Sequence, residues 1–108
     1  MRIGFSLPLH GSAAHGEGLI AIATQAEALG YESLWVWERL LAPVNPKAAY
    51  PLGDGTHPAS FRSVLDPIEA LTFVAGHTRR ITLGTSVLVL PLYNPVLLAR
   101  QLTTLDVL

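Results

Sequence analysis

The chain contains no cysteine and only one methionine among its 108 residues. The absence of cysteine excludes disulfides and cysteine-based metal sites. Charged residues are also scarce, at 14% of the chain, and they nearly cancel to a formal net charge of -1. Because positive charge is not in excess, the composition gives no reason to expect a nucleic acid or an anionic membrane surface as a partner.

Hydrophobic residues make up half of the sequence, which is typical of a globular chain with a large core. The apolar start is interrupted by Gly4, Ser6 and Pro8, so it lacks the pattern of a secretory signal. The most apolar region, residues 81–98, contains hydroxyl side chains, Asn94 and two prolines. Those residues suit a buried strand followed by a turn better than a membrane span, and we expect a cytoplasmic protein.

Three strand-then-helix units follow one another along the chain. The apolar runs predict strands over residues 2–7, 33–37 and 81–90. Helical spacing and capping signals predict helices over residues 17–29, over 67–78 and from residue 95 onward, the last with Leu98, Leu102 and Leu105 on one face. This alternation predicts an α/β fold with a parallel sheet.

The absence of two phosphate-binding motifs helps to choose between a barrel and an open parallel sheet. Gly11 and Gly16 have the spacing of a Walker loop, but Glu17 and Gly18 follow where that loop needs Lys and Ser or Thr. No G-x-G-x-x-G follows the first strand either, so the sequence favours a (β/α)8 TIM barrel over a Rossmann fold. A barrel needs about 250 residues. We therefore predict that residues 1–108 are a single partial domain, the N-terminal three βα units of a barrel, and that its open sheet edge leads to association, for example as a homodimer.

A long loop, residues 39–65, follows the second strand and contains four prolines. Loops of this length are usually lids or binding loops, although a tolerated surface insertion has the same signature. His57 in this loop and His10 after the first strand lie on the expected ligand side, and we predict that they contact the substrate. The alternative is that both are ordinary loop residues. No pair of the four histidines has metal-ligand spacing, so we do not expect a metal site.

Two further sites interrupt apolar strands at the same expected edge. Glu38 and Arg39 end the second strand, where a carboxylate can accept a hydrogen bond from a ligand or act as an acid or base. The alternative is a surface ion pair. Thr85 and Ser86 place hydroxyls in the third strand, which indicates either a backbone bulge beside a ligand or small residues packed inside a barrel.

Together these segments resemble the bacterial luciferase-like superfamily, in particular its coenzyme F420 (deazaflavin) dependent oxidoreductases. The resemblance rests on RIGFSLP at the start, ALGYESLWV from residue 28, Asp66-Pro67, RRITLGTSV from residue 79, and YNP followed by LARQ. It implies hydride transfer between the deazaflavin and a small organic substrate. FMN-dependent monooxygenases share the fold and are the alternative, and a non-catalytic barrel fragment that acts through association is a third possibility.

The resemblance also implies residue roles. A bulge with a cis peptide bond at Ser86-Val87 is expected to press on the cofactor ring, with Thr85, Glu38 and Arg39 as further cofactor contacts. Glu38 is the expected catalytic residue. Arg39 stands where the family often has histidine, and arginine does not deprotonate, so proton transfer is not expected of it. Because the family holds the phosphate tail of its cofactor with later loops, these 108 residues alone are expected to be inactive.

Overall fold

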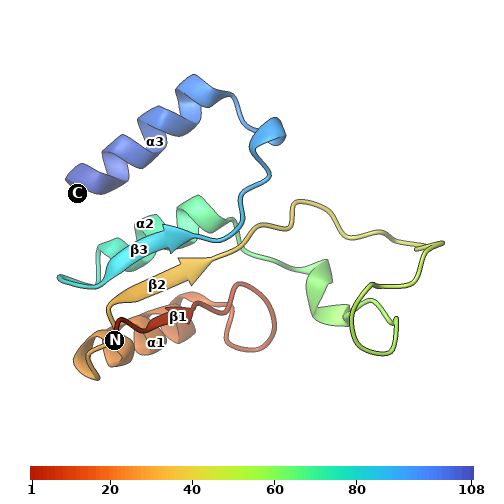
Figure 1. The fold of residues 1–108 in the computed structure, drawn as a ribbon, viewed down its shortest axis with the longest axis horizontal. Helices are drawn as coiled ribbons and strands as arrows, with labels where there is room; N and C mark the ends of the chain where they lie inside the picture. Colours follow the sequence, from red (N-terminus) through yellow and green to blue (C-terminus); the bar gives the residue numbers. More distant parts are fainter.

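The computed structural model describes residues 1–108 as three parallel strands with helices between them (Figure 1). The elements in order are β1 (Gly4–Ser6), α1 (Gly16–Ala28), β2 (Ser33–Val36), η1 (Ala59–Arg62), α2 (Pro67–Ala75), β3 (Thr82–Thr85), η2 (Leu90–Leu92) and α3 (Pro95–Val107). The sheet order is β1-β2-β3, and both strand pairs are parallel. The predicted βα units are confirmed.

The capping side chains begin the helices where the sequence predicts. The Asp66 carboxylate accepts from the N–H groups of Ile68 and Glu69 at 2.9 and 3.0 Å. The Asn94 side chain does the same for the first turn of α3. Gly30 follows α1 with a φ of 86°, a left-handed conformation that suits glycine. Two predicted ends are wrong: α2 stops at Ala75 rather than near residue 78, and β3 stops at residue 85 rather than 90.

The core lies between the sheet and helices α1 and α2. Its largest fully buried side chains come from the strands, their ends and α2: Leu7, Leu9, Leu34, Val36, Leu71 and Val74. The helix α3 packs against α2 and buries only Leu98, while Leu105 is partly buried against the core and Leu102 is largely exposed. No helix of the structure has the length and apolar character to cross a membrane.

The face of the sheet that these helices leave open is covered in part by the Trp35 indole. A Cβ atom added to Gly84 would lie 2.6 Å from the indole Cζ3, and one added to Gly4 would lie 2.5 Å from Nε1. Trp35 and Gly84 are paired in the ladder, so the indole extends over both neighbouring strands. The indole N–H donates to the Ser33 hydroxyl at 2.8 Å. Glycine at position 84 is therefore required by the packing of this ring.

Gly84→Ala is expected to destabilise the protein at its natural length by about 1–3 kcal/mol, because the new methyl group overlaps the indole. Urea unfolding measures the change. Gly76→Ala is the control, since its Cβ would be 3.5 Å from the nearest atom and its φ is -65°. In a Trp35→Leu background the destabilisation caused by Gly84→Ala should be smaller. An unchanged loss of unfolding free energy in that background would refute the packing explanation.

A second long-range contact fixes the turn before β3. The Glu27 carboxylate, near the end of α1, accepts from the backbone N–H groups of Arg79, Arg80 and Ile81 at 2.8, 2.6 and 2.9 Å. These hydrogen bonds, with that of Arg80 first, lower the pKa of Glu27 from 4.5 to about 2. The charged form is thus the one that the folded chain prefers.

Because the folded pKa is lowered, the contribution of Glu27 is complete above pH 4.5 and is lost as the pH falls towards 2. We expect Glu27→Gln to lower the thermal midpoint at neutral pH, and the difference from the wild type to shrink through this acid range. Thermal unfolding followed by circular dichroism at a series of pH values measures it. Glu17→Gln, an exposed carboxylate in the first turn of the same helix, is the control. A difference that is independent of pH would contradict the assignment.

Candidate functional site

The ladder between β2 and β3 contains one extra residue just beyond Thr85. The Ser86 N–H donates to the Val36 carbonyl at 2.7 Å. In a regular parallel ladder the Ser86 carbonyl would then accept from the N–H of Glu38, two residues on. That N–H instead donates to the carbonyl of Val87 at 3.0 Å. The one-residue offset is a β-bulge at Ser86–Val87, where the family resemblance implies one.

The cis peptide expected at this bulge is wrong, because every peptide bond in the chain is trans. The extra residue alone redirects the backbone out of the sheet and towards η2. The chain thus changes direction without a cis peptide bond. Such a bond between non-proline residues costs about 3–4 kcal/mol. The same change of direction explains why β3 ends at Thr85.

Glu38 fixes the segment that follows the bulge. Its Oε2 accepts from the Val89 N–H at 2.6 Å, and its Oε1 accepts from the Tyr93 hydroxyl at 2.8 Å. Burial, together with the hydrogen bond to Glu38 and its charge, raises the pKa of Tyr93 well above the usual value, so its hydroxyl stays protonated and donates. Each carboxylate oxygen can accept a second hydrogen bond, so Glu38 retains capacity for a ligand.

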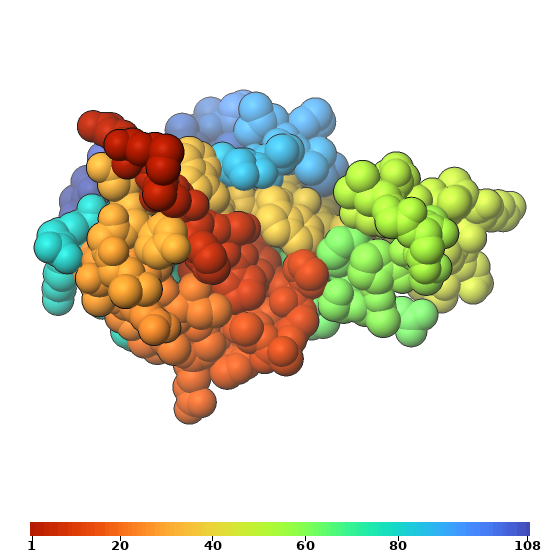
Figure 2. Space-filling view, turned by 60° about the horizontal axis from the view of Figure 1, so that its bottom comes forward, coloured from red at the N-terminus to blue at the C-terminus, as the bar shows by residue number.

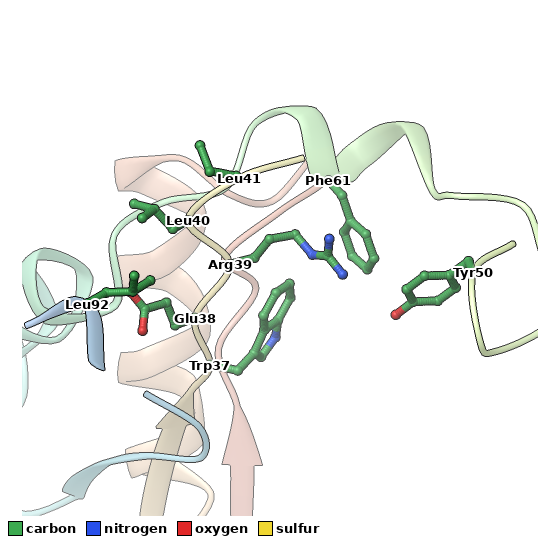
Figure 3. A pocket seen from close by; sticks show the side chains of 8 residues that line it. All are labelled: Trp37, Glu38, Arg39, Leu40, Leu41, Tyr50, Phe61 and Leu92. Atoms are coloured by element: carbon green, nitrogen blue, oxygen red, sulfur yellow. The ribbon is translucent and has the colours of Figure 1, made fainter. Parts of the chain in front are cut away.

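Arg39 points away from this contact, and its carboxylate neighbour points in the other direction (Figure 3). The guanidinium carbon lies 4.2 Å from the centroid of the Phe61 ring and 5.9 Å from that of Tyr50. These are cation–π distances. The surface ion pair considered as an alternative is therefore absent between Glu38 and Arg39, since the one ion pair of the structure joins Arg2 to Glu32.

A partly open pocket of about 530 Å³ lies between these side chains. Its lining is Trp37, Glu38, Arg39, Leu40, Leu41, Tyr50, Phe61 and Leu92. It sits beyond the carboxyl end of β2, the ligand side of parallel barrels. The volume falls in the range of small-molecule sites, about 300–1,000 Å³.

The loop of residues 39–65 supplies part of this pocket. It projects from the sheet as a separate lobe (Figure 2) and carries η1. The end of the loop is bonded to the segment that follows β1. The Leu65 N–H donates to the Leu9 carbonyl at 2.8 Å, and Val64 forms a β-bridge with His10. The Phe61 ring makes an edge contact with Trp37 at 5.7 Å. Aromatic pairs of this kind contribute about 0.5–1.5 kcal/mol each beyond area burial.

The two predicted substrate histidines lie behind the pocket wall. His10 hydrogen-bonds the Ser60 hydroxyl at 3.0 Å, and its ring contacts Trp37 and Phe61. His57 Nε2 hydrogen-bonds the Ala48 carbonyl at 3.2 Å, and its ring packs against Tyr50. Both histidines support rings that line the pocket, and their contact with substrate stays a prediction.

The predicted cofactor contacts divide between the two faces of the sheet. Thr85 is paired with the buried Val36 and lines a groove beside α3, away from the pocket. Ser86 and Val87 are exposed, the latter at 64%, and the Val87 carbonyl accepts from the N–H of Glu38. The structure therefore brings Glu38, Arg39, Ser86 and Val87 to one edge and leaves Thr85 apart.

The sequence assigned no role to two aromatic residues that line the pocket, or to Tyr93, which contacts Glu38. Tyr50 and Phe61 are aromatic residues in the proline-rich loop, and that unusual placement was a usable signal. Tyr93 stands directly before the Asn94-Pro95 helix start, but nothing local relates its hydroxyl to a carboxylate 55 residues earlier.

A parallel sheet with helices between its strands is the architecture of the N-terminal βα units of a TIM barrel. The profile of the luciferase-like monooxygenase family matches residues 1–108, and the chain belongs to that family.

Relatives of the chain occur in mycobacteria. Uncharacterised proteins of two Mycobacterium tuberculosis strains and one Mycobacterium bovis strain are each 36% identical to it over 88 residues. The alignment covers 80% of this chain and 31% of each relative, so the chain spans about a third of their length.

Tyr93→Phe removes one of the two hydrogen bonds to the Glu38 carboxylate. We expect a loss of about 1–2 kcal/mol in unfolding free energy and faster amide hydrogen exchange across residues 86–93. Tyr31→Phe is the control, since that ring packs on Phe5 at the other end of the sheet. Unchanged exchange at the Val89 amide would show that the contact does not hold the segment.

Proposed function

We propose that this chain forms the ring-binding edge of an oxidoreductase that transfers hydride between coenzyme F420, a deazaflavin, and a small organic substrate. The observation that carries the proposal is the bulge at Ser86–Val87 beside the Glu38 carboxylate, next to the pocket. Bulges concentrate next to active sites, where they redirect the backbone. Membership of the luciferase-like monooxygenase family supports an enzyme of the oxidoreductase kind.

The residues at this edge fit a flat ring system with a substrate beside it. Ser86 and Val87 expose the bulge to the ring, and the Val87 carbonyl is bonded to the N–H of Glu38, which lines the pocket. Six of the eight lining residues of the pocket are hydrophobic, so its walls suit the apolar body of the substrate. Glu38 adds a fixed acceptor for an N–H or O–H of the ring or of the substrate.

Each residue of the edge has a distinct part. A bound deazaflavin supplies the hydride chemistry. Glu38 accepts a hydrogen bond or a proton from the ligand, and the Tyr93 hydroxyl and the Val89 N–H keep its carboxylate in place. A guanidinium does not act as an acid or base in proteins, so Arg39 orients ligands without moving protons. Leu40 and Leu92 give the pocket an apolar wall.

Cofactor titration of the protein at its natural full length tests the proposal. Oxidised coenzyme F420 and FMN are added separately, and the absorption change of each is followed on binding and on reduction. We expect F420 to bind and its reduced form to be reoxidised by a substrate from a panel of small organic acceptors. Glu38→Gln should weaken F420 binding by roughly tenfold through the lost charged acceptor, whereas Glu69→Gln, an exposed carboxylate of α2, should not.

Two outcomes would overturn the deazaflavin assignment. Tight binding of FMN with no response of reduced F420 would make the protein an FMN-dependent monooxygenase. Absence of binding by either cofactor would favour the non-catalytic interpretation, in which the sheet edge and α3 serve association such as the predicted homodimer.

A further inference from the structure

The Arg39 guanidinium is a fixed cation with no anionic partner in the structure. The one ion pair joins Arg2 to Glu32, at the opposite end of the sheet. Glu38 is turned towards Val89 and Tyr93. Arg39 is half-buried, so its charge lies within the pocket wall rather than free in solvent.

Stacking fixes the guanidinium and leaves its donors available. Its carbon lies 4.2 Å from the Phe61 ring centroid, so the aromatic ring takes up one side of the cation. The five N–H donors of a guanidinium lie in its plane and form a fork that matches a carboxylate or phosphate. None of them is a buried donor without a partner, so they are accessible to solvent or ligand.

The other walls of the pocket are apolar and aromatic. The centroids of the Phe61 and Tyr50 rings lie 4.2 and 5.9 Å from the guanidinium carbon, and Trp37 and leucines complete the lining (Figure 3). A cation held among aromatic rings recognises a molecule that has an apolar body and one anionic group, because the body fills the walls and the anion meets the fork.

We propose that Arg39 is a specificity residue that binds the carboxylate or phosphate of an aromatic substrate. This rests on the proposed function for the assignment of the ligand as substrate. The direction of the side chain supports that assignment. Arg39 points towards Phe61 in the loop, whereas Glu38 points towards the segment after the bulge. The cofactor ring is proposed to lie beside that segment.

The test measures binding of benzoate, phenyl phosphate and neutral benzamide to the natural full-length protein by calorimetry, first without and then with saturating cofactor. Without cofactor we expect both anions to bind at least roughly tenfold more tightly than benzamide. Arg39→Gln should reduce that preference to about twofold or less, and Arg39→Lys should retain part of it. Arg62→Gln is the matched control, since Arg62 is an exposed arginine of η1 in the same loop, and this variant should keep the full preference.

Equal binding of benzoate and benzamide, absence of binding by both anions, or a preference that survives in Arg39→Gln would overturn the proposal. The arm with cofactor separates the two sources of an anionic group. Anions that still bind to the cofactor-loaded protein support a substrate site. Displacement of benzoate by the cofactor, with weaker cofactor binding in Arg39→Gln, would reassign Arg39 to the cofactor and overturn the substrate proposal. Because the first arm uses no cofactor, failure of hydride transfer and failure of anion binding are distinguished.

Discussion

The candidate site depends on the hydrogen bonds between Glu38 and the segment that follows β3. The regular ladder ends at Thr85, and beyond it the chain leaves the sheet through the bulge. The backbone N–H and both carboxylate oxygens of Glu38 then replace the missing ladder. Hydrogen bonds to a charged acceptor are about twice as strong as neutral ones. An acidic residue at this position therefore organises the wall that contains Leu92 as well as offering an acceptor to a ligand.

The alternation of side chains along an extended backbone gives the neighbouring residues opposite tasks. Glu38 is directed to the segment after β3, while Trp37 and Arg39 are directed to the loop of residues 39–65. Three consecutive residues after β2 thus contact two segments that are distant in sequence. These segments, the loop of residues 39–65 and the segment after β3, form the two walls of the pocket. The loop wall is held by aromatic and cation–π contacts, and the bulge wall by hydrogen bonds to a carboxylate.

Local chemistry explains which features could be predicted from the sequence. The helix starts at Asp66 and Asn94 follow from short-range capping. Small polar residues within an apolar strand indicated either a bulge or small packed residues, and the family resemblance implied the bulge that the structure contains. The contact of Glu38 with Tyr93 joins residues 55 apart, and that of Glu27 with Arg80 joins residues 53 apart. Such contacts leave no periodic trace in one sequence. The strand end was misplaced for the same reason, since the apolar run continues past the point where the backbone turns away.

The packing of Trp35 explains why the site lies at the strand ends rather than on the open face of the sheet. Parallel sheets are stable with both faces covered, and helices cover only one face here. In a closed barrel the other face is interior, and the indole covers part of it above Gly84 and Gly4. Gly84 lies two residues before Ser86, so the ring lies directly beneath the bulge. The pocket lies beyond this level, at the strand end where Glu38 and Arg39 diverge.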